Sequence, residues 1–343
     1  MRRISCILLF ANMSILCKAQ LPHFEYESIS NGNLNFPIFS NSSSPQTAEK
    51  INQYLQLSEL GLLKGHERND IFEQVTNNGG SIYGTKRNLY FRIIENSDKV
   101  LSLMFDETSC GATCAYWNIY YNFNAGNGDR VLLNDLFTQS GFELFKKQII
   151  EREKKELQLQ SQDISAIEKD NREQNLQDIE DNKTENFFIR NDSIIDDSWN
   201  SDSRNRKFGA PYIFVAFALS EFKNYLNDYG KALFGITTRN MAKFRSKELP
   251  QLFSGTIEGR HEILLIIRKR YERHVDGIYA YLKIGTGINL DGEIKNDSIH
   301  LIEKTANFDD NGYIDAVFNG ETISGSWADK GRTKTLKFEV HRK

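Results

Sequence analysis

Runs of alternating apolar and polar residues, divided by short turn signals, fill residues 253–343. Gly, Asn and Asp mark the turns, which fall at residues 285–287, 296–297, 309–312, 319–320 and 329–331. With the long run 262–273 in front of them, these segments predict about seven antiparallel strands. We expect an up-and-down β-meander, curved or nearly closed into a small barrel, with the boundary to the preceding module near 245–255.

Residues 20–250 mix helix and strand patterns, so the chain as a whole is predicted to be α+β, with an antiparallel sheet in this first module. Ser44-Pro45 is typical of a helix start, because a capping hydroxyl precedes a proline at the first helical position. Strand-like alternation follows at residues 89–93, 101–105 and 115–123. The last of these, AYWNIYYNF, is rich in aromatic residues suited to a pleated surface, and a glycine turn after it predicts a hairpin.

A charged insert at about residues 150–186 interrupts this module. Ser140 and Glu143 predict a capping box at the start of a helix, and residues 143–185 then carry 8 basic and 12 acidic side chains. We expect one or two solvated helices with a disordered middle; a partner-binding arm is the alternative. Residues 191–209 are typical of a loop, whereas 212–219 predict a buried strand, followed by a short helix that ends at Gly230.

The first nineteen residues have the anatomy of a secretory signal peptide. Arg2 and Arg3 precede the apolar stretch 4–16, and Cys17-Lys18-Ala19 places small residues at the −3 and −1 positions of a cleavage site. We therefore expect a periplasmic or secreted protein, cleaved after Ala19. A lipoprotein anchored at Cys17 is less favoured because bulky Leu16 precedes the cysteine, and a buried helix is the remaining alternative.

The charge and cysteine content of the chain are consistent with export. Removing Arg2, Arg3 and Lys18 with the leader leaves 40 basic and 46 acidic side chains, which argues against a nucleic-acid partner. No run of apolar residues in the mature chain is long enough for a transmembrane helix. The mature chain keeps Cys110 and Cys114, whose short spacing with Gly111 favours a local disulfide; free thiols and a redox or metal site are the alternatives.

Motifs that carry catalysis are missing from the sequence, and no cofactor is predicted. A nucleophile elbow and a phosphate-binding loop are absent, the six histidines are scattered, and Asn307 to Gly312 resembles a turn more than a calcium loop. Catalytic and metal-binding residues are therefore predicted to be none, and an enzyme is the less favoured class.

Two groups of residues are candidates for ligand binding. Trp117, Tyr120 and Tyr121 on the aromatic segment could stack on sugar rings, although simple core packing is the alternative. Arg268 and Arg270 share one face of a basic strand and could bind an anionic partner, although a solvated outer face is the alternative.

The segment from Cys110 to Phe137 resembles secreted proteins of the RsiV-like superfamily. It joins a Cys-Gly-Ala turn, an aromatic strand, a glycine turn and Leu132-Leu-Asn-Asp-Leu-Phe137; patches elsewhere in residues 33–230 extend the likeness. That superfamily includes the extracellular part of a lysozyme-sensing anti-sigma factor and an accessory module of peptidoglycan deacetylases. The C-terminal segment resembles a β-meander of secreted bacterial proteins of unknown function.

These observations together predict a non-enzymatic cell-envelope protein that binds a protein or a wall glycan such as peptidoglycan. The alternative is a peptidoglycan-acting hydrolase whose acidic residues cannot be picked out from the sequence, and a purely structural interaction protein that uses the charged arm is the third possibility.

Overall fold

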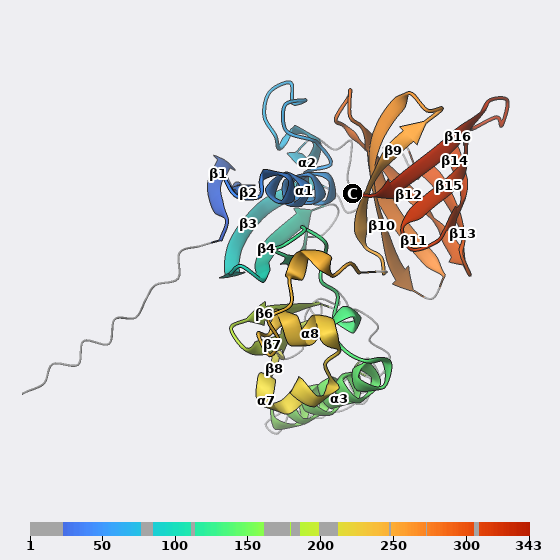
Figure 1. Ribbon diagram of the computed structural model, residues 1–343. Coiled ribbons are helices and arrows are strands. Elements are labelled where there is room, and N and C mark those ends of the chain that lie inside the picture. The colour runs from blue at the N-terminus through green and yellow to red at the C-terminus, as the bar shows by residue number, and fades with distance from the viewer. Residues whose placement is uncertain are drawn as a thin grey trace, which may run out of the picture.

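The computed structural model describes residues 23–76, 85–110, 114–160, 179, 186–198, 212–246, 248–271, 273–304 and 309–343. The expected signal peptide and most of the charged insert lie outside these residues. Figure 1 shows three parts: a sheet covered by helix α1, a smaller sheet with helix α8 beside it and helices α3 and α7 below, and a barrel beside the first sheet.

The first part is a five-stranded sheet in the order β1-β2-β3-β4-β5. Neighbouring strands run antiparallel, except that β2 meets β3 in parallel at a single pair, Leu34 and Leu89. Its elements are β1 Glu25–Asn31, β2 Leu34–Ser40, α1 Pro45–Leu55, the π-helical turn η1 Gln56–Leu60, α2 Glu73–Thr76, β3 Thr85–Asn96, β4 Val100–Cys110 and β5 Cys114–Asn124.

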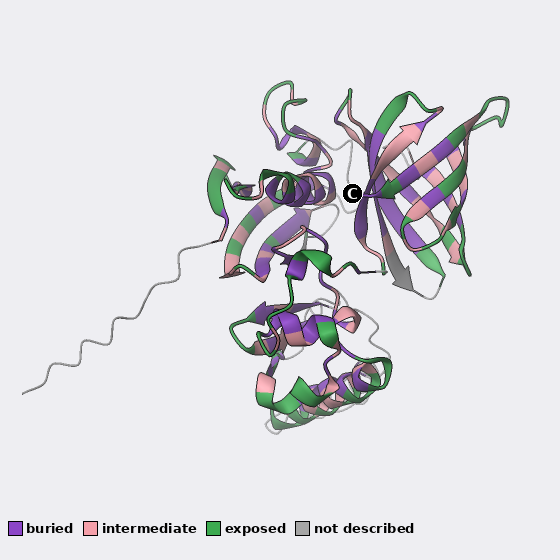
Figure 2. Ribbon diagram, in the orientation of Figure 1, coloured by how far each residue is buried: buried purple, intermediate pink, exposed green. Residues whose placement is uncertain are grey.

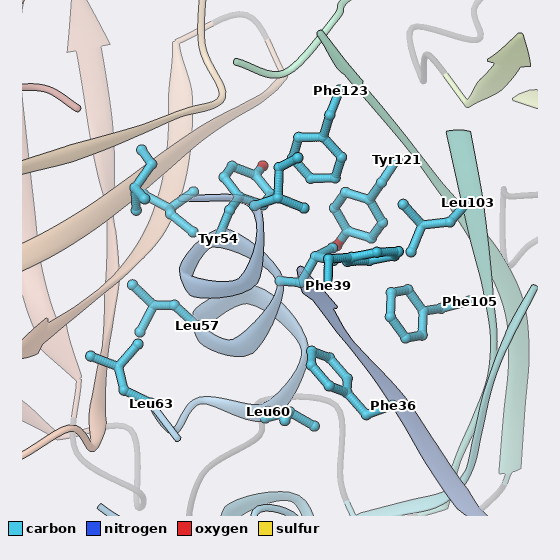
Figure 3. Packing of buried hydrophobic residues seen from close by; sticks show 14 of the residues in the cluster. Phe36, Phe39, Tyr54, Leu57, Leu60, Leu63, Leu103, Phe105, Tyr121 and Phe123 are labelled. Atoms are coloured by element: carbon cyan, nitrogen blue, oxygen red, sulfur yellow. The ribbon is translucent and has the colours of Figure 1, made fainter. Parts of the chain in front are cut away.

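One face of this sheet packs against α1 and η1 to form a core rich in aromatic rings (Figure 3). Helix α1 begins with Pro45 at its first turn, as the sequence predicts, and turns Ile51 and Tyr54 toward the sheet. The rings of Phe36 and Phe105 stack at 5.7 Å between centroids, and Phe105 also meets Tyr121 edge to face. Burying each such side chain contributes about 1.5–3 kcal/mol.

The second part surrounds the three-stranded sheet β6-β7-β8. Its elements are η2 Asn134–Leu136, α3 Gln139–Gln160, β6 Phe187–Arg190, β7 Ser193–Asp196, β8 Val215–Ala218, α7 Leu219–Phe222, η3 Lys223–Tyr225, α8 Asp228–Leu233 and η4 Met241–Lys243. Two local predictions are wrong here. Residues 193–196 form a strand rather than a loop, and Gly230 lies inside α8, where a Cβ would come 2.2 Å from the Leu136 carbonyl oxygen.

The third part is a closed antiparallel barrel of eight strands, in the order β10-β11-β12-β13-β14-β15-β16-β9. The strands are β9 Gln251–Ile257, β10 His261–Tyr271, β11 His274–Tyr281, β12 Gly287–Lys295, β13 Ser298–Lys304, β14 Asp310–Phe318, β15 Thr322–Asp329 and β16 Thr335–Arg342. The α+β class and the meander or barrel prediction are confirmed. The strand that the sequence pattern missed is β9, which closes the barrel by pairing with both β10 and β16.

The barrel docks on the first part through the outer surface of β9, β10 and β11 (Figure 2). Leu264, Ile266 and Ile278 point away from the lumen, yet they are buried in the same cluster as Leu57 and Leu60 of η1. Backbone hydrogen bonds lock the contact, since Gly287 N donates to the Gly61 carbonyl at 2.8 Å and Leu63 N to the Gly285 carbonyl at 3.0 Å.

Candidate functional site

Strand β5 divides its side chains between the two faces of the five-stranded sheet. Trp117 and Tyr121 turn to the core side, where Tyr121 is 5% exposed, whereas Tyr116 and Asn118 turn to the outer side. Alternation along a strand makes this division, but a sequence with aromatic residues on both faces does not tell which face is covered.

On the core side, two buried carboxyl groups meet one lysine. Lys86 Nζ lies 2.9 Å from a Glu59 oxygen and 2.9 Å from a Glu107 oxygen, and the two glutamate side chains are 3% and 2% exposed. Tyr121 OH donates to Glu59, and Trp117 Nε1 donates to Glu107 at 3.1 Å. The pair therefore comes from η1 and β4, with its donors on β3 and β5.

The surroundings shift the pKa values of the two carboxyl groups in opposite directions. Burial acts to raise the pKa of Glu59, but the Lys86 charge and three hydrogen bonds outweigh it and hold that pKa at about 2. Burial and the neighbouring Glu59 charge raise the pKa of Glu107 well above its usual range. Burial would lower the pKa of Lys86, yet its two carboxyl partners leave that pKa raised. One ammonium and one carboxylate then balance, with Glu107 protonated.

The geometry of Glu59, Lys86 and Glu107 is typical of a structural ion-pair cluster. Glycoside hydrolysis needs two carboxyl groups that face a sugar between them, about 5–10 Å apart. Here Lys86 Nζ fills the position between the two groups. The ion pairs of Glu59 and Glu107 with Lys86 thus connect η1 to β3 and β4.

The outer side of the same sheet carries exposed tyrosines beside polar groups. Tyr90 on β3, Asp106 on β4 and Asn118 on β5 form one row across the sheet. Tyr90 is 45% exposed, and Tyr116, in the next row of β5, is 57% exposed. We call Tyr90, Asp106, Tyr116, Asn118 and Tyr212 the tyrosine face.

Tyr212 extends the tyrosine face beyond the strand edge. Its hydroxyl accepts a hydrogen bond from Asn118 Nδ2 at 2.9 Å, while half of the side chain is exposed. Its ring meets Phe214 edge to face at 4.8 Å, and Phe214 is 43% exposed. Tyr120 also points to this side but is covered, because Phe188 of β6 stacks on its ring at 4.8 Å.

Cys110 and Cys114 form the predicted disulfide, which joins the ends of β4 and β5 with 4.0 Å between their Cα atoms. The two cysteines are the terminal pair in the register of this hairpin. Since Tyr116 follows two residues later, the disulfide fixes the strand end that presents it.

The basic pair predicted on β10 lies elsewhere. Arg268 faces the first part of the molecule, where its guanidinium lies 3.2 and 3.3 Å from the two carboxylate oxygens of Asp276. Arg270 belongs to β10, but its side chain lies outside the described residues. Ligand binding by this pair and by Trp117, Tyr120 and Tyr121 stays a prediction.

The described ranges contain neither a cluster of metal-ligating side chains nor a helix suited to a membrane. No group of three His, Cys, Asp or Glu side chains there could hold a metal ion. None of the helices in those ranges combines the length and apolarity that crossing a bilayer requires.

The fold is similar to two crystal structures of DUF3298 family proteins. One, from Bacteroides fragilis, gives a TM-score of 0.45 at 13% identity and covers 64% of this chain and 99% of its own. The other, from Pseudomonas aeruginosa, gives 0.39 at 12% identity over 61% of this chain and 96% of its own. No family model matches the sequence, and no curated protein does. The likeness concerns the fold alone.

Strand β5, on which the sequence analysis placed Trp117, Tyr120 and Tyr121, also contributes Tyr116 and Asn118 to the tyrosine face. The sequence analysis did not select Tyr90, Tyr116 and Tyr212, because they lie in three separate segments that only the fold brings together. A signal was present in the alternation of residues 89–93, where Tyr90 occupies the position opposite to Leu89 and Phe91.

Proposed function

We propose that the protein is a non-enzymatic cell-envelope protein that binds a wall glycan on the tyrosine face. The observation that carries the proposal is the exposure of Tyr90, Tyr116 and Tyr212 around the polar pair Asp106 and Asn118. Sugar rings present apolar C–H faces and hydroxyl rims. Tyrosine rings match the first, and carboxylate and amide groups match the second.

The dimensions of the face suit an extended ligand. Two strand spacings and two residues along the strand separate Tyr90 from Tyr116, which places their Cα atoms about 12 Å apart. Arg92, also exposed, adds a cation beside Tyr90. A ligand held on an open sheet face stays in contact with water, which favours binding over turnover.

The position of Glu107, whose pKa is raised well above its usual range, also favours binding over hydrolysis. Glu107 points to the core side, away from the tyrosine face, and is held by Lys86 and Trp117. A bound glycan would therefore meet Asp106 without the second, protonated carboxyl group that hydrolysis requires.

Export belongs to the same proposal. The leader at residues 1–19 and the resemblance of residues 33–230 to the RsiV-like superfamily support an envelope location, where a wall glycan would be within reach. The disulfide between Cys110 and Cys114 is consistent with an oxidising compartment.

Retention on purified peptidoglycan tests the proposal. Residues 20–343 are mixed with peptidoglycan and sedimented, and the retained fraction is compared with that of the double variant Tyr90→Ala/Tyr116→Ala. We expect the variant to bind about tenfold more weakly, because it loses two ring contacts, and contacts between aromatic side chains are worth about 0.5–1.5 kcal/mol each. Tyr26→Ala is the matched control, since Tyr26 is 50% exposed on β1, at the far edge of the sheet.

Two outcomes would contradict the proposal. One is a wild-type protein that is not retained; the other is equal retention of the double variant. Release of soluble wall fragments by the same sample would instead support the hydrolase alternative.

A further inference from the structure

A glutamate carboxylate lies inside the barrel, away from the tyrosine face. Glu303 on β13 points into the lumen, as do Ile299 and Leu301 on the same strand, and it is 1% exposed. Three side chains from three other strands donate to it. Tyr279 OH and Trp327 Nε1 donate to Oε1, and Asn311 Nδ2 donates to Oε2 at 3.1 Å.

All three donors are neutral. A carboxylate enclosed in an apolar barrel is stabilised by a counter-charge, which these donors do not supply. Among the described residues no cationic group lies within ion-pair distance of Glu303. The next residue, Lys304, points the other way along the alternating strand, and its Nζ lies 2.6 Å from Asp310.

Aromatic rings surround this carboxylate toward the end of the barrel. Tyr279 and Tyr281 meet edge to face at 5.5 Å, and the Trp327 indole approaches from β15. Tyr279 is 1% exposed, whereas Tyr281 and Trp327 are half-buried, so exposure increases from the carboxylate toward the rim. At the rim, His261 contacts the Tyr281 ring at 6.2 Å.

Gly312 of β14 brings its backbone close to Oε2. A Cβ at Gly312 would come 2.7 Å from that oxygen, closer than real Cβ contacts allow. Asn311 is the neutral partner on this oxygen, so Oε2 keeps a further lone pair for another donor.

We propose that this end of the barrel binds the ammonium group of a small organic amine. The ammonium would donate to Glu303 Oε2 and lie against the faces of Tyr281 and Trp327, which are the partners that cation–π attraction favours. The interior of an eight-stranded barrel is just filled by side chains or holds one small ligand, and barrel mouths are common binding sites. This proposal does not depend on glycan binding by the tyrosine face.

The test uses the full mature chain, residues 20–343, with n-butylammonium chloride as probe. Binding is followed through the NMR signal of the Trp327 indole N–H, which is identified by its loss in Trp327→Phe. We expect a saturable shift of this signal with n-butylammonium and none with n-butanol, which has nearly the same shape without the charge.

Variants separate a binding role from a structural one. In Glu303→Gln one of the two acceptor oxygens remains and the charge is lost, so binding should weaken at least tenfold in a variant that still folds. Glu293→Gln, on the outer side of β12, is the matched control and should bind as the wild type does. Tyr281→Leu, at the rim, should weaken binding several-fold and serves if Glu303→Gln does not fold.

Three results would each overturn the proposal: no shift with n-butylammonium, an equal shift with n-butanol, or undiminished binding by folded Glu303→Gln and Tyr281→Leu.

Discussion

Lys86 decides the ionisation of two buried acids at once. Its ammonium touches Glu59 and Glu107, and the first is held ionised while the second is held protonated. The cost of burying charge is met only while the cation is present, because a carboxylate without a partner in a low-dielectric core is strongly destabilising. Glu59 and Glu107 are the same residue type, so the charges and hydrogen-bond donors around each one set its pKa.

Lys86→Met should lower the free energy of unfolding by about 3–5 kcal/mol, because it leaves a buried carboxylate without its partner. Glu107→Gln should change it by no more than about 1 kcal/mol at neutral pH, because glutamine replaces an acid that is already uncharged. Guanidinium unfolding at pH 7 measures both. A larger loss in Glu107→Gln than in Lys86→Met would show that the assignment of protonation is wrong.

Asp135 should make stability depend on pH. Burial raises the pKa of this carboxyl group to about 6, against the lowering effect of hydrogen bonds from Leu132 N and Ser246 Oγ. Because the folded pKa is above that of the unfolded chain, the folded state loses stability as pH rises from about 4 to 6.

Asp135→Asn removes this dependence. The variant should gain stability relative to the wild type between pH 4 and pH 7, by at most about 3 kcal/mol. Urea unfolding across this range measures the difference. Ser246→Ala removes a bond that lowers the Asp135 pKa, so it should move the transition to higher pH; a shift to lower pH would contradict the assignment.

At the scale of elements, the β4–β5 hairpin places different groups of residues on its two sides. Its inner side carries Glu107, Trp117 and Tyr121 into the core, and its outer side presents Asp106 and Tyr116. The register is fixed at the strand ends by the disulfide between Cys110 and Cys114. A slip by one residue would exchange the two sides, so the covalent link protects both.

Cys110→Ser/Cys114→Ser should therefore cost about 2 kcal/mol, the loop-closure value for so short a loop. The thermal midpoint of the variant, compared with that of the wild type with and without reductant, measures this. Reduced wild type and variant should unfold together. Fraying of the strand end in the variant should also lower its retention on peptidoglycan. A thermal midpoint equal to that of the wild type would show that the other contacts of the hairpin hold it without the disulfide.

At the scale of the whole molecule, the outer surface of the barrel belongs to the same hydrophobic core as the five-stranded sheet, the first part of the molecule. This surface contributes Leu252, Leu264, Ile266, Ile278 and Ala280 to the cluster that includes η1. The last residue reaches the same boundary, where Lys50 Nζ donates to the Lys343 carbonyl at 2.6 Å and pairs with Asp129. The two parts are therefore expected to unfold together.

Ile266→Asp should destabilise both parts, by more than about 3 kcal/mol, because it places a charge in this shared core. The matched control is Val317→Asp on the barrel, where the side chain is 52% exposed and the change should stay within about 0.5 kcal/mol. Calorimetry measures both. Two separate transitions in the wild type would contradict a shared core.

Local pattern determined a large part of this protein. Alternation along residues 262–342 predicted the antiparallel strands, Ser44-Pro45 predicted the start of α1, and short spacing predicted the Cys110–Cys114 disulfide, because each depends on residues close in sequence. The glycines that permit close backbone approach, such as Gly230, could not be interpreted this way, since their neighbours are far along the chain.

Only the tertiary structure decided which sides of the strands are covered and what meets there. Glu59, Lys86 and Glu107 come from three elements, and Tyr90, Tyr116 and Tyr212 come from three separate segments. Glu303 accepts hydrogen bonds from residues on three other strands. Burial, ionisation and exposure depend on such neighbours. Sequence periodicity gives the two sides of a strand, but packing alone chooses between them.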